Sequence, residues 1–198
     1  MNSEKKVSQK SGLFLNKLKK VPIWAWMVIL TISCAFGLYY RASVVVEGMV
    51  ASMSLGIQTS VFFVITLIVA ALAEPFVIRL FARLDYSIAS RIYFRSTSYV
   101  PDFNLRKLPV KYEDFLIVVL FVYSLINIVT GIFGLLSMAF PYASYLLSIP
   151  ANLFKIGCFV WSAFIMKPSV ADWEMKNAFI ALGLPSTIFL CFSLGVLI

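Results

Sequence analysis

Polar residues recur on one face of a predicted helix inside the apolar segment 142–166. They are separated by 4, 3 and 7 positions, which return to the same side of an α-helix: Ser148, Asn152, Lys155 and Ser162. An amine and an amide on one face could line a polar path through a membrane, because an intramembrane lysine usually faces a bundle interior or a wet cavity. Asn127, in the segment 115–136, could extend such a path or hydrogen-bond across helices.

The sequence leaves two interpretations of Lys155 open. A lysine near the bilayer centre costs about 2.5–3.5 kcal/mol on insertion scales, which favours burial beside other polar groups. Alternatively, Pro150 begins the helix. Lys155 would then lie at a shallow depth and extend its amine outward to the interface.

Enzymatic chemistry lacks its usual residues in this chain. There is no histidine, which excludes His-based triads, His metal ligands and His pH switches. No G-x-S-x-G, Walker A or G-x-G-x-x-G pattern occurs. The three cysteines lie in separate apolar runs without a C-x-x-C pair, so neither a metal site nor a disulfide framework follows. We therefore expect a protein that is not an enzyme and that needs no cofactor.

Positive charge gathers in the stretch that follows the second apolar segment. Separations of 4, 8 and 4 residues keep four arginines on one broad side of a helix: Arg79, Arg83, Arg91 and Arg95. One interpretation is a helix in the headgroup layer, with arginines on lipid phosphates or on a partner protein. The other is a cytoplasmic extension of the second span that follows the positive-inside rule.

Small residues recur in the second and third apolar segments, where they would allow helix backbones to approach closely. The candidates for such packing are Gly48, Ser52, Gly56, Ser60, Gly131 and Gly134. Packing within one chain and a dimer face are both compatible with this pattern.

Composition indicates the class of protein in which these residues must be positioned. Hydrophobic residues make up 61% of the 198 residues and charged residues 13%, against about 45–50% and about 25% in soluble domains. We predict an all-α, polytopic membrane protein: a basic cytoplasmic N-terminal segment, 1–20, and a five-helix transmembrane domain, 21–198. The predicted spans are about 21–40, 48–73, 115–136, 142–166 and 177–198.

The connection between the second and third spans carries the strongest topological signal. Glu74 and Pro75 follow the second span, so we expect the helix to bend or stop there, with Glu74 at its cytoplasmic end. A cytoplasmic basic loop, 79–114, comes next. Fifteen Lys and Arg residues would lie on this side of the membrane and one, Arg41, on the other, which predicts a cytoplasmic N-terminus and an outside C-terminus.

Three stretches are similar to the Yip family of small five-span membrane proteins: "RSTSYVP" after span two, "WSAFIM" in span four and "KNAFIALGLPSTIFL" in span five. The resemblance covers roughly residue 60 to the end. It implies a membrane organiser or adaptor, and it assigns no functional residue.

Two functions remain open on this evidence. One is a non-catalytic membrane scaffold or interaction protein, involved in membrane organisation or trafficking. The other is a transporter subunit with a polar path near Lys155 and Asn127. The net charge of +8 lies in two blocks beside apolar spans, so the expected partners are anionic lipid headgroups rather than nucleic acid. A protein partner or a homo-oligomer is also expected, in a bacterial plasma (inner) membrane.

Overall fold

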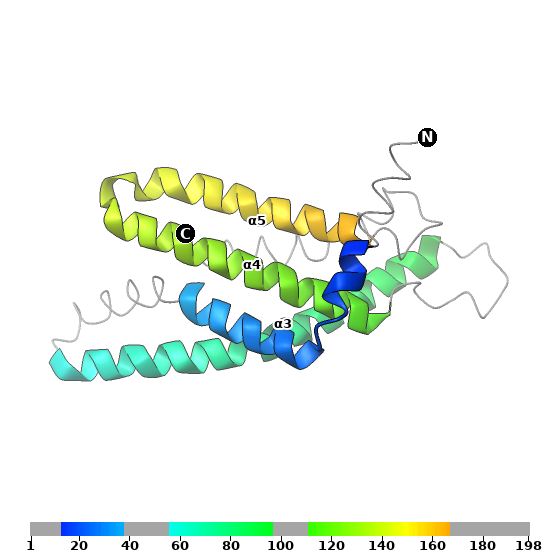
Figure 1. Ribbon diagram of the computed structural model, residues 1–198, viewed down its shortest axis with the longest axis horizontal. Coiled ribbons are helices and arrows are strands. Elements are labelled where there is room, and N and C mark those ends of the chain that lie inside the picture. The colour runs from blue at the N-terminus through cyan, green and yellow to red at the C-terminus, as the bar shows by residue number, and fades with distance from the viewer. Residues whose placement is uncertain (1–12, 38–55, 97–110, 167–198) are drawn as a thin grey trace.

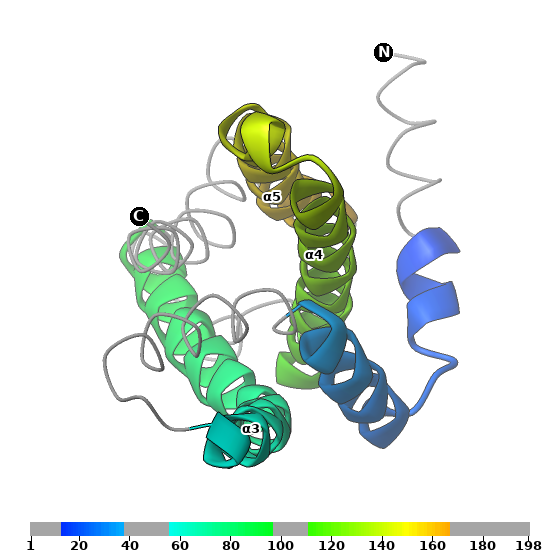
Figure 2. The same cartoon turned by 90° about the vertical axis from the view of Figure 1, so that its left-hand side faces the viewer.

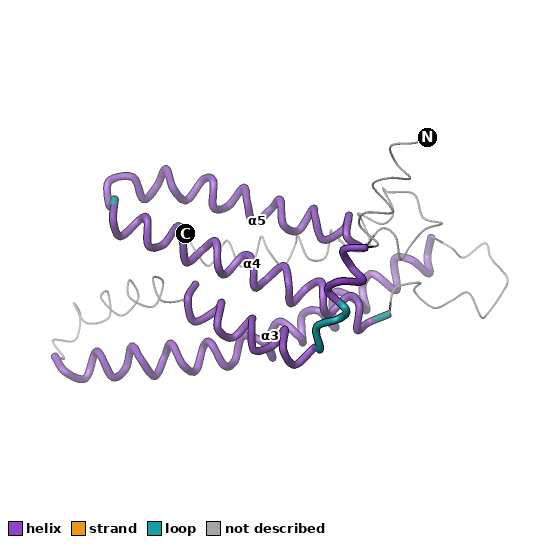
Figure 3. Tube along the Cα trace, viewed as in Figure 1, coloured by secondary structure: helices purple, strands orange, loops and turns teal. Residues whose placement is uncertain are grey.

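The structure is a computed structural model, and it describes residues 13–37, 56–96 and 111–166. Helix makes up 94% of the described residues and none of them forms a strand, so the predicted all-α class is confirmed. Figure 3 shows this helical content along the chain. The elements are a short helix 13–18, the helix Ile23–Gly37, α3 (Gly56–Ser96), α4 (Tyr112–Ala139), the 3-10 turn η2 (Pro141–Ala143) and α5 (Ser144–Met166).

Helices α4 and α5 form an antiparallel hairpin. Figures 1 and 2 both show α5 beside α4, with the helix Ile23–Gly37 on the other side of α4. Pro141 begins the η2 turn, where its missing N–H costs nothing. The segments Tyr112–Ala139 and Pro141–Met166 have mean hydropathies of 2.5 and 1.5, and each is long and apolar enough to cross a membrane. The helix Ile23–Gly37 is also apolar, but it is shorter.

Helix α3 corrects the predicted end of the second span. It runs for 41 residues, with Pro75 inside it, so residues 79–96 are helical, as both interpretations of the four arginines expected. Figure 1 shows α3 changing direction along its course, as expected of a helix in which a proline removes one hydrogen bond. The expected bend is therefore compatible with the structure, whereas the expected stop is wrong.

Helix α5 corrects one interpretation of Lys155. The helix begins at Ser144, and Pro150 lies inside it. Lys155 therefore follows almost three turns of helix and does not belong to the first turn.

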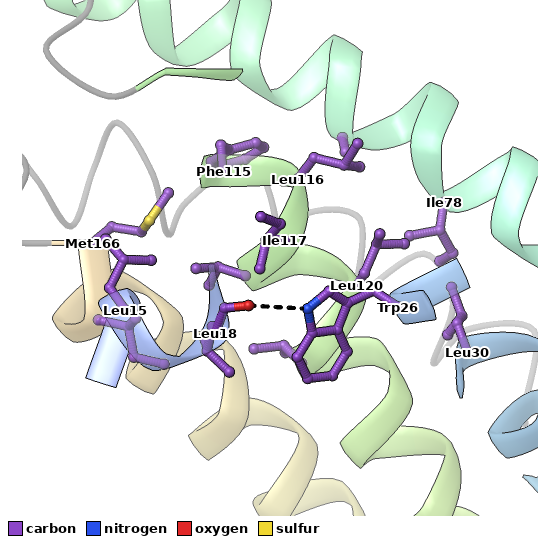
Figure 4. Close-up of a cluster of buried hydrophobic side chains, with 14 of the residues drawn as sticks. Leu15, Leu18, Trp26, Leu30, Ile78, Phe115, Leu116, Ile117, Leu120 and Met166 are labelled. Atoms are coloured by element: carbon purple, nitrogen blue, oxygen red, sulfur yellow. Dashed lines mark hydrogen bonds between the residues drawn. The ribbon is translucent and has the colours of Figure 1, made fainter. Parts of the chain in front are cut away.

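The N-terminal residues close one end of the bundle. The indole Nε1 of Trp26 donates to the carbonyl oxygen of Leu18 at 3.3 Å, and Figure 4 shows Leu15 and Met166 beside this contact. Lys19 Nζ lies 2.7 Å from Asp114 Oδ2 in the first turn of α4. The start of α4, the end of α5 and residues 13–20 thus meet at the same end, opposite the η2 turn.

Several sequence predictions lie outside the described residues. These are the fifth span 177–198, the segments 1–12, 38–55 and 97–110, and the loop that begins at Lys167. The number of spans therefore stays a prediction.

Candidate functional site

A carboxyl group lies between three helices near the middle of α4. Asn127 Nδ2 donates to Glu74 Oε1 at 2.7 Å, and the Cys34 thiol donates to Glu74 Oε2. Cys34 is fully buried, and Glu74 and Asn127 are partly buried. We call Cys34, Glu74 and Asn127 the Glu74 cluster, and it joins the helix Ile23–Gly37, α3 and α4.

The Glu74 cluster corrects the expected depth of its acidic residue. The sequence predicts Glu74 at the cytoplasmic end of a span, because a proline usually bends or ends a helix. Asn127 lies 15 residues after the start of α4 and 12 before its end, so its partner Glu74 also lies near mid-helix. One signal in the sequence indicates this: apolar residues continue directly after the proline, at Phe76, Val77 and Ile78.

Close backbone packing holds the Glu74 cluster together. A Cβ atom added to Gly37 would lie 2.8 Å from the backbone oxygen of Asn127. A Cβ atom added to Gly131, one turn further along α4, would lie 2.3 Å from Cδ1 of Phe36. Small residues therefore bring the helix Ile23–Gly37 against α4 at the level of Asn127.

The other predicted packing residues are placed as follows. Gly134 is buried on α4 and faces a cavity beside α5. Gly56 and Ser60 lie in the first turns of α3, and Gly48 and Ser52 lie outside the described residues. Within the described chain, the glycine contact that the structure places between helices is thus an intrachain one, at Gly37 and Gly131.

Lys155 lies in a cavity between the two helices of the hairpin. The cavity has a volume of about 380 Å³, and its polar lining includes Thr130, Ser137, Ser148, Asn152 and Lys155. Lys155 is 5% exposed, and its Nζ lies 3.4 Å from Asn152 Oδ1. The lysine is therefore buried rather than extended outward. Chemically, the cavity could hold a small anion or water.

Three hydroxyl groups that line the cavity differ in their hydrogen bonds. Ser137 donates to the carbonyl oxygen of Phe133 at 2.9 Å, and Ser148 donates to that of Tyr145 at 2.7 Å. Among the described residues, the buried Oγ1 of Thr130 finds no hydrogen-bond partner. The two serines thus bond within their own helices, and the threonine does not.

The predicted pair of Asn127 and Lys155 does not form one site. Asn127 contacts Glu74 on α3, and it is not among the residues that line the Lys155 cavity. Asn152, by contrast, shares that cavity with Lys155 as predicted from their spacing. Sequence periodicity relates residues on one helix, but it does not show which helix each face meets.

The basic half of α3 lines a second cavity. Its volume is about 540 Å³, and its lining residues are Phe76, Arg79, Leu80, Arg83, Tyr86 and Tyr112. Arg91 is exposed further along the helix, and Arg95 lies in the last turn of α3. Arg79 and Arg83 therefore share a cavity, and Arg91 does not line it.

Metal chemistry has no support within the described residues, which contain no group of three or more His, Cys, Asp or Glu side chains able to hold a metal ion. Cys34 and Cys158 are buried free cysteines, and Cys191 lies outside the described residues.

Comparisons with protein-family models, with curated proteins and with solved structures found no match. The resemblance to the Yip family therefore stays a prediction from the quoted stretches.

Proposed function

We propose that this chain is a non-catalytic integral membrane scaffold or interaction protein, with five spans, in a bacterial inner membrane. The observation that carries the proposal is the Glu74 cluster. Its carboxyl group accepts hydrogen bonds from an amide and a thiol on two other helices. A mid-helix acid that accepts hydrogen bonds from two other helices joins those helices, as a structural scaffold requires.

Apolar exposure supports the membrane placement. Several large apolar side chains along α3 are more than half exposed, among them Val61 at 56%, Val69 at 60% and Phe76 at 67%. Soluble monomers rarely expose contiguous apolar patches of this extent. A bilayer, or a partner helix within it, would cover these side chains.

The distribution of charge supports the orientation. Lys19 pairs with Asp114, and the Tyr112 hydroxyl donates to the backbone oxygen of Arg79 at 3.4 Å. These contacts gather the basic N-terminal segment, the basic half of α3 and the start of α4 at one end. The positive-inside rule assigns this end to the cytoplasm, which gives a cytoplasmic N-terminus and an outside C-terminus.

A transporter subunit is the second candidate, and the Lys155 cavity favours it. A buried cation with an amide and hydroxyl groups around it is a common arrangement where an anion passes or binds. Asn127 does not line this cavity, so such a path would have to rely on α5 and the end of α4.

Anion flux separates the two candidates. We expect proteoliposomes that contain the purified chain to release chloride or phosphate no faster than protein-free vesicles, and Lys155→Leu to behave like the parent. Photo-crosslinking in native membranes should give one adduct of defined mass from the exposed position Leu72, and none from the matched position Ala82, which is 1% exposed.

The opposite pattern would favour transport. Flux through the parent chain that Lys155→Leu abolishes and Lys155→Arg retains would replace the scaffold proposal with the transporter one.

A further inference from the structure

We propose that the cavity at Arg79, Arg83 and Tyr112 is a discrete binding site for the phosphate headgroup of an anionic phospholipid. The inference rests on the proposed membrane placement and deepens it, because it replaces a diffuse attraction between basic residues and lipid with one bounded site.

The two arginines give the cavity a positive charge that favours the binding of an anion. Arg79 and Arg83 are both exposed and stand one helical turn apart, where like charges repel each other. Within the described chain, neither guanidinium forms an ion pair, and Asp114 is already paired with Lys19. Guanidinium groups bind phosphate through paired N–H donors. One phosphate between the two arginines would accept hydrogen bonds from both guanidinium groups and would reduce the repulsion between them.

The remaining walls suit a lipid better than a soluble phosphate. Phe76 and Leu80 are 67% and 59% exposed beside the arginines, and they line the same cavity. The Tyr86 ring packs edge to face on the Tyr112 ring, with 5.5 Å between the ring centroids, and its centroid lies 5.8 Å from that of Phe115. The site therefore combines two cations with an apolar flank along α3, which matches a headgroup followed by an acyl chain.

Arg91 supplies a matched control. It carries the same charge on the same helix and is exposed, but it does not line the cavity. A diffuse electrostatic attraction would use Arg91 as well as Arg79 and Arg83, whereas a bounded site would not.

The test is lipid binding to the purified full-length chain, measured by native mass spectrometry. Phosphatidic acid should bind as one tight molecule and should outcompete phosphatidylcholine with the same acyl chains. Arg79→Gln and Arg83→Gln should each weaken this binding about fivefold, from about 1 kcal/mol per basic residue. Arg91→Gln should weaken it less than about twofold, the range expected away from the site.

Three outcomes would overturn the proposal. If Arg91→Gln weakened lipid binding as much as Arg79→Gln and Arg83→Gln, the attraction would be diffuse. If phosphatidylcholine bound as tightly as phosphatidic acid, the site would not select the headgroup. Displacement of the lipid by excess inorganic phosphate would mean a site for a soluble anion. Resistance of the chain to alkaline extraction from membranes is measured separately, so that failure of the lipid site is distinguished from failure of the membrane placement.

Discussion

Replacement of Asn127 by leucine is expected to lower the free energy of unfolding by about 2–3 kcal/mol, because an acceptor enclosed between helices loses its donor. Asn127 Nδ2 donates to Glu74 Oε1 at 2.7 Å, and a leucine side chain has no N–H to donate. Of the two donors that the described residues supply, the carboxyl group would keep the Cys34 thiol, which is a weak donor. Reversible unfolding in mixed micelles would measure the change.

A double-mutant cycle tests whether the pair itself carries this cost. Glu74→Leu combined with Asn127→Leu should be less destabilising than the sum of the two single changes, because replacing both partners leaves no unsatisfied group. Ser137→Ala is the control on α4, since its hydroxyl bonds within its own helix, and it should cost less than about 0.5 kcal/mol. Additive single changes would contradict the contact.

Gly37→Ala is expected to destabilise the chain by about 1–3 kcal/mol, the range for overpacking a close contact. The added methyl group would lie 2.8 Å from the backbone oxygen of Asn127. The backbone oxygen of Asn127 cannot rotate away from the added methyl group as a side chain could. The helix Ile23–Gly37 would therefore have to move away from α4. Reversible unfolding in mixed micelles would measure this change in stability. The movement of the helix should also weaken the hydrogen bonds of the Glu74 cluster.

Gly157→Ala is the matched control for this prediction. Beyond its own helix backbone and chain neighbours, no atom of the described residues lies within 4 Å of a Cβ atom at Gly157, and alanine is favoured over glycine in helices by up to about 1 kcal/mol. This variant should be neutral or more stable. Equal destabilisation by Gly37→Ala and Gly157→Ala would show that loss of glycine, and not the helix contact, is the cause.

Sequence periodicity predicted features that depend on one helix alone. The apolar runs indicated α4 and α5 to within a few residues, and spacing predicted that Asn152 and Lys155 share one helix face, which in the structure borders one cavity. Both features follow from the 3.6-residue repeat and from continuous hydrophobicity. Neither requires knowledge of neighbouring helices.

Contacts between helices were beyond the reach of the same reasoning. Glu74 was assigned to a helix end because proline usually breaks helices. In α3, however, Pro75 is buried inside a long helix. The Cys34 contact joins residues 40 positions apart and the Asn127 contact residues 53 apart, and no local pattern encodes either. Likewise, spacing places four arginines on one face of a helix, but it does not show that Arg79 and Arg83 share a cavity with Tyr112 of α4.

We propose above that the α4–α5 hairpin and its neighbouring helices cross a membrane with their basic end in the cytoplasm. Reporter fusions along the chain test this topology most directly. Fusions after Lys20, Arg106, Met138, Asp172 and Ile198 should read cytoplasmic, cytoplasmic, outside, cytoplasmic and outside. Met138 is decisive, because it lies at the end of α4 next to the η2 turn. A cytoplasmic reading at Met138 would contradict the account, since α4 would then not cross the membrane.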